Sequence, residues 1–176
     1  MPDIIAYVSD KGKTIAKVRR DEAHRRGLLH REVDIVVINR HGLLLGYREQ
    51  RSQWCFIGGH VQYGESCKDA AIREFQEEAG YRLHPGELAE ATEYRRCTSP
   101  KEGDINNRIT TVFVCVKDIA LEELTEGDRY VTKLKYFTKP NVDDLKKNKK
   151  IMKGTIYVLD SVPIVLGHCL PSKAAK

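Results

Sequence analysis

The sequence predicts a mixed α/β fold built as one globular domain. Its 176 residues fit a single domain, because such domains cluster at roughly 100–200 residues. The β-branched run at residues 33–38 predicts a buried strand, and the amphipathic pattern at residues 66–79 predicts a helix that packs on a sheet. Further strand-like runs follow that helix, so strands and helices alternate along the chain.

The first predicted unit is a β-hairpin. Residues 33–38 form a nearly continuous β-branched run, residues 39–42 supply Asn and Gly for a turn, and residues 43–47 are again mostly apolar. Two apolar runs separated by a short segment of this composition are typical of paired antiparallel strands.

A segment with a glycine pair and a helix follows the hairpin. Residues 54–57 and 60–63 are expected to be short extended pieces on either side of the glycine pair. Ser66 can then cap a helix that runs to about Ala79 and stops at Gly80. Ser is favoured at helix N-caps, and Gly is favoured just beyond helix C-termini.

The second half of the chain predicts three more strands and a final helical region. The strand-like runs lie at about residues 87–96, 109–117 and 130–137, and the helical region starts near residue 142, just after a proline. We divide the chain into three parts on this basis. They are an N-terminal extension packing on the domain (1–30), the domain core (31–140) and a C-terminal helical extension (141–176).

Composition excludes several classes of protein. With 41% hydrophobic and 31% charged residues, the chain can bury a core and is too apolar to be fully disordered. It contains no apolar run near the roughly 18 residues that a membrane span needs, and its first residues lack the pattern of a secretory signal. We therefore expect a cytoplasmic protein with no membrane partner.

The cysteines indicate free thiols. They are odd in number and form no Cys-x-x-Cys pair, so neither a disulfide framework nor a zinc knuckle is indicated. The five are Cys55, Cys67, Cys97, Cys115 and Cys169.

The net charge of +5 is unevenly distributed. Residues 31–130 carry 13 Lys and Arg against 18 Asp and Glu, a net −5, and the segments on both sides are net basic. A basic periphery around an acidic centre could attract a polyanionic substrate whose phosphates then need a cation. A solvated lysine surface at residues 146–150 is the simpler explanation. Nucleic acid is not an expected partner, because these lysines lack interleaved aromatic residues.

The predicted helix at residues 66–79 carries the residues with the most specific chemistry. Glu74, Glu77 and Glu78 fall on one arc, separate from the apolar residues, and their i, i+3, i+4 spacing makes the carboxylates neighbours. Because like charges at this spacing repel, a hard divalent cation such as Mg²⁺ or Mn²⁺ would stabilise the group. Arg73 could hold or balance Glu77, four residues later. Taken alone, the helix is explained more simply by a solvated acidic face.

The wider pattern overturns that simpler explanation. Gly59 is followed after five residues by Glu65, and seven residues later comes the run Arg-Glu-Phe-Gln-Glu-Glu-Ala-Gly at residues 73–80. Residues 59–81 resemble the signature box of the Nudix hydrolases over its full length, with all seven of its fixed letters present.

Three positions depart from the usual pattern of that family. Phe75 and Tyr81 stand where the family usually has Ile, Leu or Val, and Ile57 stands where it usually has a proline before Gly-Gly. All three are largely apolar, so we expect them to affect packing more than chemistry.

The resemblance implies a fold and a catalytic centre. Nudix domains are α/β/α sandwiches around a mixed β-sheet, and their box forms a loop, a helix and a loop that hold a catalytic divalent metal. A glycine in the box lets the backbone approach the ion closely. The residues that the resemblance implies for this centre are the metal ligands Gly59 (through its carbonyl), Glu74, Glu77 and Glu78, the organising ion-pair partner Arg73 and the supporting carboxylate Glu65.

The implied activity is hydrolysis, dependent on Mg²⁺ or Mn²⁺, of a nucleoside diphosphate linked to another moiety such as a nucleotide or a sugar. The cation would neutralise the diphosphate and lower the pKa of an attacking water, and a nearby carboxylate would accept the proton. Glu74 is one candidate for that base, and Glu123 and Glu126 are others. Arg48 and Arg51 could contact phosphate, although each is individually more typical of a surface arginine.

A second resemblance covers residues 20–81. Residues 27–31 (Gly-Leu-Leu-His-Arg) and 59–66 (Gly-His-Val-Gln-Tyr-Gly-Glu-Ser) resemble type 1 isopentenyl-diphosphate isomerases and their hydrolase relatives. In those isomerases a catalytic cysteine lies immediately before the Gly-His pair, where this chain has Gly58. The intact box and the missing thiol favour hydrolysis. His30 could correspond to an isomerase metal ligand, but a structural role is the simpler interpretation.

The sequence specifies the substrate less well than the reaction. Subfamilies that act on ADP-ribose carry a proline about 15 residues after the box, where this chain has Arg95 and Arg96. The segment 44–48 together with Trp54 is somewhat similar to GDP-mannose mannosyl hydrolases. Trp54, Tyr47 or Tyr94 could stack on a base or sugar, although a lone Trp before a turn is more often part of the hydrophobic packing.

Three functions remain open from the sequence. They are a metal-dependent hydrolase of a small nucleoside diphosphate derivative, an isomerase of isopentenyl diphosphate, and a non-catalytic domain that senses a nucleotide. Residues 138–176 include a basic stretch and the apolar run at residues 162–166, and a docking helix, a homodimer contact and a lid all remain open for them.

Overall fold

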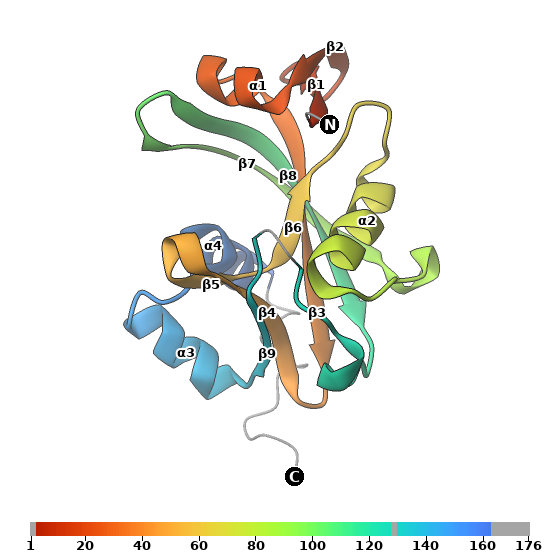
Figure 1. The fold of residues 1–176 in the computed structure, drawn as a ribbon, viewed down its shortest axis with the longest axis vertical. Helices are drawn as coiled ribbons and strands as arrows, with labels where there is room; N and C mark the ends of the chain where they lie inside the picture. Colours follow the sequence, from red (N-terminus) through yellow and green to blue (C-terminus); the bar gives the residue numbers. More distant parts are fainter. Residues whose placement is uncertain (1–2, 128–129, 163–176) are drawn as a thin grey trace.

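The computed structural model describes residues 3–127 and 130–162, in which seven strands form one mixed sheet. Strands β5, β4, β3, β8 and β7 follow one another across this sheet, while β6 pairs with β3 and β9 pairs with β4 (Figure 1). Strand β3 is antiparallel to β4 and β6 and parallel to β8. The strands are β3 (His30–Asn39), β4 (Gly42–Arg48), β5 (Gln53–Cys55), β6 (Ile57–His60), β7 (Ala89–Lys101), β8 (Asp104–Val116) and β9 (Lys133–Phe137).

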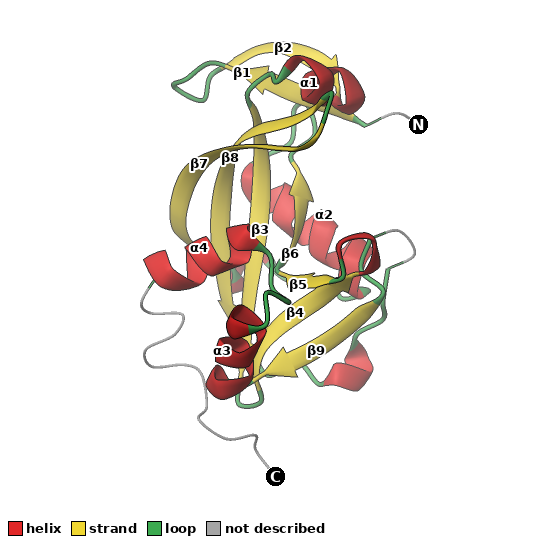
Figure 2. Ribbon diagram, turned by 90° about the vertical axis from the view of Figure 1, so that its left-hand side faces the viewer, coloured by secondary structure: helices red, strands yellow, loops and turns green. Residues whose placement is uncertain are grey.

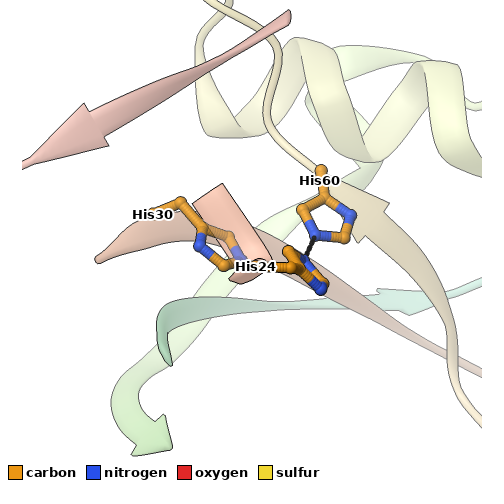
Figure 3. A group of neighbouring side chains, drawn as sticks. All are labelled: His24, His30 and His60. Carbon is orange, nitrogen blue, oxygen red and sulfur yellow. Dashed lines mark hydrogen bonds between the residues drawn. The ribbon is translucent and has the colours of Figure 1, made fainter. Parts of the chain in front are cut away.

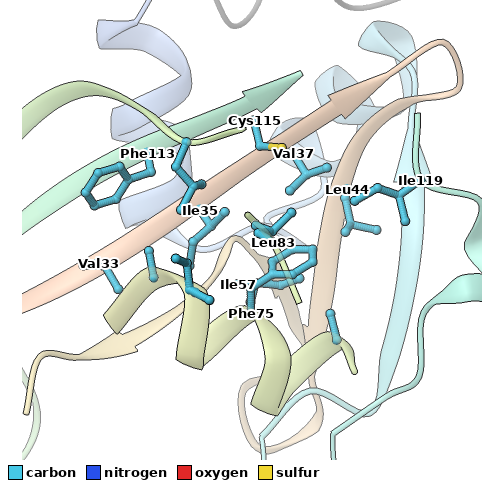
Figure 4. Packing of buried hydrophobic residues seen from close by; sticks show 14 of the residues in the cluster. Val33, Ile35, Val37, Leu44, Ile57, Phe75, Leu83, Phe113, Cys115 and Ile119 are labelled. Atoms are coloured by element: carbon cyan, nitrogen blue, oxygen red, sulfur yellow. The ribbon is translucent and has the colours of Figure 1, made fainter. Parts of the chain in front are cut away.

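Helices cover both faces of the sheet, as Figure 2 shows. Alternate residues of β3 point to opposite sides, as the period of a strand requires. Ile35 packs in a buried cluster with Phe75 (Figure 4), whereas Val36 packs in a second buried cluster with Val142 and Val158. The fold is therefore the predicted α/β/α sandwich around a mixed sheet. The covering helices are α2 (Cys67–Ala79) on one face and α3 (Lys139–Lys147) and α4 (Lys153–Ser161) on the other.

Helix α2 begins and ends where the sequence predicts. The Ser66 Oγ accepts a hydrogen bond from the Asp69 backbone N–H at 3.1 Å, which caps the first turn. Gly80 ends the helix in the left-handed conformation, with φ of 66°, and a Cβ at this position would overlap the Thr125 hydroxyl. Gly80 is thus required both by its backbone angles and by its neighbour.

The glycine pair lies inside a strand and not between two extended pieces. Extended segments were predicted at residues 54–57 and 60–63, but β5 covers Gln53–Cys55 and β6 covers Ile57–His60. Gly58 pairs with Asp34 of β3, and a Cβ on Gly58 would overlap the Val33 carbonyl oxygen. This close approach of β6 to β3 requires glycine, which the local sequence pattern does not reveal.

Strands β7 and β8 are longer than predicted. Strands were expected at about residues 87–96 and 109–117, yet β7 continues to Lys101 and β8 begins at Asp104. Their extra residues are mostly polar, and most of them pair across the two strands, for example Asn107 with Cys97. Because these residues lie beyond the apolar core, their strand structure depends on pairing and leaves no apolar pattern in the sequence.

Residues 4–26 form a small layer at one end of the sheet (Figure 2). Strands β1 (Ile4–Val8) and β2 (Thr14–Arg19) pair antiparallel, and helix α1 (Arg20–Arg26) follows them. The Val8 backbone N–H donates to the Leu29 carbonyl at 2.8 Å, which ties this layer to the start of β3.

The C-terminal helices α3 and α4 have nine residues each. Helix α3 begins three residues before the predicted start near residue 142, because Pro140 lies within its first turn. Of the apolar run at residues 162–166, only Val162 lies within the described residues, and it is buried. Among the helices of residues 3–127 and 130–162, none is long and apolar enough to cross a membrane.

The cysteines of the described residues are free thiols, as composition predicts. Cys55 and Cys115 are buried, whereas Cys97 is exposed. The fifth, Cys169, lies outside the described residues.

We expect Phe75→Ala to lower the free energy of unfolding by about 3–5 kcal/mol, because it leaves a cavity between α2 and the sheet. The Phe75 side chain is completely buried and packs edge-on against Tyr81 at 6.5 Å between ring centroids. Urea denaturation followed by circular dichroism measures the change. Phe75→Leu, which keeps most of the volume, should cost clearly less; equal losses for the two variants would contradict this packing.

Candidate active site

A cavity of about 980 Å³ opens between the sheet and helices α1, α2 and α4. Ligand pockets typically enclose about 300–1,000 Å³, so this one can hold a nucleotide-sized molecule. The cavity brings most of the predicted site residues together, whereas Glu65 and Trp54 do not line it. Those that line it are Arg48, Arg51, Gly59, Arg73, Glu74, Glu77 and Glu78.

The three glutamates of α2 lie beside β6 at one end of the cavity. The side chain of Glu78 is 7% exposed, that of Glu74 is 13% exposed and that of Glu77 is 57% exposed, so the group runs from the protein interior to solvent. Gly59 lies against Glu74, and a Cβ on Gly59 would overlap the Glu74 carboxylate. Only glycine allows the strand backbone and the helix carboxylates to come this close.

Arg73 connects the parts of the box. Its guanidinium donates to both oxygens of Glu65, at 2.9 and 3.0 Å, and to the His60 carbonyl at 2.9 Å. The Nη1 group also donates to Glu74 at 2.8 Å and to Glu77 at 3.2 Å. Glu65 therefore orients Arg73, and Arg73 in turn positions Glu74 and Glu77, two of the three box carboxylates that line the cavity.

Arg48 forms an ion pair with Glu78. Its Nη2 lies 3.0 Å from Glu78 Oε1 and donates to the Gly58 carbonyl at 3.2 Å, while the Gly58 N–H donates to Glu78 Oε2 at 3.3 Å. Arg48 was predicted as a phosphate contact, and the structure shows it holding a buried carboxylate. Arg51, the other predicted contact, lines the cavity and is exposed.

Burial changes the protonation of the carboxylates at this end of the cavity. It raises the pKa of Glu74 to about 7, against the opposing charge of Arg73. It also raises the pKa of Glu78, with Arg48 acting in the opposite direction. Both shifts arise because the charged form loses hydration that the neighbouring arginine only partly replaces.

The donor set at this end of the cavity fits a hard divalent cation. Carboxylate oxygens and a backbone carbonyl are the ligands that Mg²⁺ and Mn²⁺ prefer. Glu74, Glu77 and Glu78 could supply the carboxylates, and Gly59 could supply the carbonyl. The space that the missing Gly59 side chain leaves beside Glu74 is the structural feature that favours this assignment.

Three imidazoles gather beside another part of the cavity, where His24 and His60 line the wall and His30 is buried (Figure 3). His24 of α1, His30 of β3 and His60 of β6 each offer a ring nitrogen, and these atoms lie within 4.8 Å of one another. His24 Nε2 and His60 Nε2 are 2.9 Å apart. The His30 Nε2 is buried and has no hydrogen-bond partner among the described residues.

The imidazole cluster has the properties of a metal-binding group. Burial lowers the pKa of His60 to about 3, so its ring is neutral and able to ligate. Glu32 lies 3.3 Å from His60 Nε2 and could add a carboxylate. Such a set suits Zn²⁺ or Mn²⁺. Only His30 was considered from the sequence, because nothing local links it to His24 and His60 on two other elements.

Trp54 packs in the interior. Its ring meets Phe137 edge-on at 4.8 Å and Tyr47 at 5.1 Å between centroids, and it lies against the second core cluster. The structure thus does not bring this predicted substrate residue to the cavity. The packing depends on Phe137, more than 80 residues later in the chain, so the sequence around Trp54 could not show it.

The two alternative bases also lie away from the cavity lining. Glu123, in the short 3₁₀ helix η3 (Leu121–Glu123), accepts a hydrogen bond from the Ala120 backbone N–H at 2.9 Å and so caps that turn. Glu126 is exposed. Of the three candidates, Glu74 alone lines the cavity.

The wall formed by β3, β7 and β8 carries several polar residues, of which only Tyr94 was connected with a substrate from the sequence. Tyr94 donates to Asp34 at 3.0 Å, and burial raises the pKa of Asp34 to about 6. Arg108 pairs with Glu32 at 2.8 Å. Glu32 and Asp34 alternate with Val33 in an otherwise apolar strand, and this i, i+2 spacing of carboxylates was the signal that could have identified them.

Comparison with protein families gives one match. The family model described as NUDIX domain matches residues 28–157. Among curated proteins, an uncharacterized Nudix hydrolase of Streptomyces coelicolor is 33% identical over 85 residues, which cover 44% of this chain and 47% of that protein. An isopentenyl-diphosphate delta-isomerase of Serratia proteamaculans is 31% identical over 88 residues, 46% of this chain and 49% of that protein. The chain spans about half the length of these curated relatives.

Solved structures share the fold at low sequence identity. A Deinococcus radiodurans protein aligns over 93% of this chain and 99% of its own, with a TM-score of 0.64 and 18% identity. A bifunctional NMN adenylyltransferase/ADP ribose pyrophosphatase of Francisella tularensis, complexed with AMP and a Mn ion, aligns over 77% of this chain and 41% of its own, with a TM-score of 0.60 and 21% identity.

Proposed function

Because this chain belongs to the Nudix hydrolase family, we propose that it is a divalent-metal-dependent hydrolase that cleaves a nucleoside diphosphate linked to another moiety. The observation that carries the proposal is the arrangement of Glu74, Glu77 and Glu78 around Gly59 at one end of a nucleotide-sized cavity. Arg73 and Arg48 orient these carboxylates by direct hydrogen bonds.

The residues of this end of the cavity have separable tasks. Glu74, Glu77, Glu78 and the Gly59 carbonyl would hold Mg²⁺ or Mn²⁺. Such a cation supplies charge neutralisation of diphosphate oxygens and acidifies a bound water. Glu74, which lines the cavity and is held by Arg73, would accept a proton from the attacking water. Arg51, exposed at the cavity, is available to contact a phosphate oxygen.

Three observations support the proposed substrate class. The cavity has the size for a nucleotide joined to a second group. Its acidic end suits a diphosphate that is bound through a cation. The diphosphate and the carboxylates are both negatively charged, so a cation between them can bind both. The Francisella tularensis neighbour is described as an ADP ribose pyrophosphatase and binds AMP and a Mn ion, which makes ADP-ribose-type compounds the first to test.

An isomerase of isopentenyl diphosphate is the second candidate, favoured by the imidazole cluster of His24, His30 and His60 and by the isomerases among the relatives. This chain, however, has Gly58 at the position where those isomerases have the catalytic cysteine. Cys55 lies nearby in the sequence, but burial raises its thiol pKa to about 11, so the thiolate that proton transfer needs is disfavoured. These features favour the hydrolase.

The test is product identification by mass spectrometry after incubation with Mg²⁺. The panel contains ADP-ribose, nucleotide sugars, nucleoside triphosphates, dinucleoside polyphosphates and isopentenyl diphosphate. We expect cleavage of at least one nucleoside diphosphate derivative, and we expect EDTA to abolish it and added Mg²⁺ to restore it. Dimethylallyl diphosphate as the sole product would establish the isomerase. Tight nucleotide binding without turnover would establish a sensing domain.

A further inference from the structure

Two arginines lie opposite each other on the cavity wall formed by β7 and β8. Arg96 of β7 and Arg108 of β8 are direct partners in the antiparallel register, and both line the cavity. Like charges directly opposite on neighbouring strands are destabilising. The pair therefore needs negative charge close by.

Within the described part of the chain, a carboxylate pairs with only one of these two arginines. Arg108 Nε lies 2.8 Å from Glu32 Oε2, and its Nη1 donates to Thr98 at 3.3 Å. Arg96 has neither an ion pair nor a side-chain hydrogen bond within residues 3–127 and 130–162. Two further carboxylates line the cavity nearby, and both have other partners: Asp34 of β3 accepts a hydrogen bond from Tyr94, and Asp104 of β8 lies 2.8 Å from His24 Nδ1.

Helix α4 adds positive charge near Arg96 and Arg108. A Cβ on Gly154, the second residue of this helix, would lie 3.1 Å from Arg96 Nη1 and 3.9 Å from Arg108 Nη2, so both guanidiniums face the first helical turn. Lys153 lines the cavity beside them. The positive end of the helix dipole adds to these charges, and no side chain caps it.

The order of strands separates this cluster from the box. Gly59 lies on β6 and Arg96 on β7, and β3 and β8 lie between them. Neighbouring strands are about 4.8 Å apart, so three steps across the sheet give about 14 Å. The register adds an offset of three residues along β8, from Thr111 to Arg108, which is about 10 Å at right angles, so the two backbones lie about 17 Å apart. Long arginine side chains shorten this distance, which leaves room for one sugar unit between the two ends.

We propose that Arg96, Arg108 and Lys153 bind a second phosphate of the substrate, carried one sugar unit away from the diphosphate that the box cleaves. The inference rests on the proposed function and names its substrate class, a nucleoside diphosphate derivative with an additional phosphomonoester. A phosphomonoester carries a charge of about −1.5 to −2 at neutral pH. This matches the two cations, Arg96 and Lys153, that pair with no carboxylate among the residues that the structure describes. Arginine also binds phosphate through two parallel N–H groups.

The experiment compares matched substrates that differ only in this phosphate. The first pair is ADP-ribose and ADP-ribose 2′-phosphate, and the second is NADH and NADPH. We expect kcat/KM to be about tenfold or more higher for the phosphorylated member, mainly through KM, because charge-assisted hydrogen bonds are strong. Arg96→Ala should reduce that ratio to near one, because it lowers kcat/KM mainly for the phosphorylated member, and Arg96→Lys should restore part of it.

Arg95→Ala is the matched control. Arg95 is the neighbouring residue on the same strand, but it is exposed and pairs with Asp10. It should leave the ratio unchanged. Equal kcat/KM for both members in the wild-type protein would overturn the proposal, and so would an equal loss for both members in Arg96→Ala, which would indicate a purely structural role.

A binding measurement separates this inference from the proposed function. Isothermal titration calorimetry compares adenosine 2′,5′-bisphosphate with adenosine 5′-monophosphate, and it needs no turnover. A preference of about tenfold for the bisphosphate, lost in Arg96→Ala, would support the phosphate subsite even if none of the substrates were hydrolysed. Equal affinities would overturn the subsite and leave the hydrolase intact.

Discussion

Glu77→Gln should lower kcat/KM by about a thousandfold while the fold is retained, because a metal that neutralises diphosphate contributes several kcal/mol to the transition state. Glutamine keeps the size of the side chain and removes its charge. Glu77 is the most exposed of the three box glutamates, so the loss should reflect chemistry and not packing. Steady-state kinetics on the best substrate of the panel measures the effect.

The same substitution at Glu78 separates the two roles of a buried carboxylate. Glu78→Gln should reduce activity at least as much, and it should also lower the melting temperature, because it leaves the buried Arg48 guanidinium without its ion pair. Glu90→Gln, at an exposed position on β7, is the control and should change neither quantity. Wild-type activity in Glu77→Gln and Glu78→Gln would remove the metal roles assigned to both.

Gly59→Ala has the second largest expected effect, about a hundredfold loss of kcat/KM, since a displacement of about 1 Å in a catalytic group can cost that much. The added methyl group would occupy the space of the Glu74 carboxylate and displace it. Arg73, which holds Glu74, would lose part of its network at the same time. Affinity for Mn²⁺, measured by calorimetry, should fall in parallel.

Gly86→Ala makes the same chemical change outside the cavity. Gly86 is exposed, and a Cβ there would lie 3.2 Å from the His84 ring, which can move aside. This variant should keep wild-type kinetics. If Gly59→Ala also kept them, the close approach of backbone and carboxylate would have no part in catalysis.

The box and its helix could be predicted because their signals are local. Ser66 and Gly80 fix the ends of α2 through capping and a left-handed angle, and the spacing of the glutamates fixes which face they share. The confirmed sandwich fold follows from alternation in β3, whose odd-numbered and even-numbered apolar residues meet different helices. Each of these features depends on residues within a few positions of one another.

The rest of the cavity could not be predicted because it is assembled from distant segments. The imidazole cluster joins α1, β3 and β6, and the arginine pair depends on the register of β7 with β8. Arg96 was noted only as standing where some relatives have a proline. Trp54 was expected at the substrate, but its partner Phe137 comes from β9. Pairing between remote strands leaves no local signature in one sequence.

The fold separates charged residues of the chain between the two ends of the cavity. The acidic central segment supplies the box glutamates at one end of the cavity and also Arg96 and Arg108 at the other end, where Lys153 joins them from the basic C-terminal part. A cavity with opposite charge at its two ends suits a substrate whose diphosphate is bridged by a cation and whose remote group is anionic. This is the chemical class that the two proposals share.

The most direct test of the account is hydrolysis of the best substrate in water enriched in ¹⁸O, with and without Mg²⁺, followed by mass spectrometry of both products. The account predicts that one phosphate-bearing product gains a single ¹⁸O only when Mg²⁺ is present, because water attacks phosphorus. Label on a sugar carbon, or turnover that EDTA leaves unchanged, would contradict it.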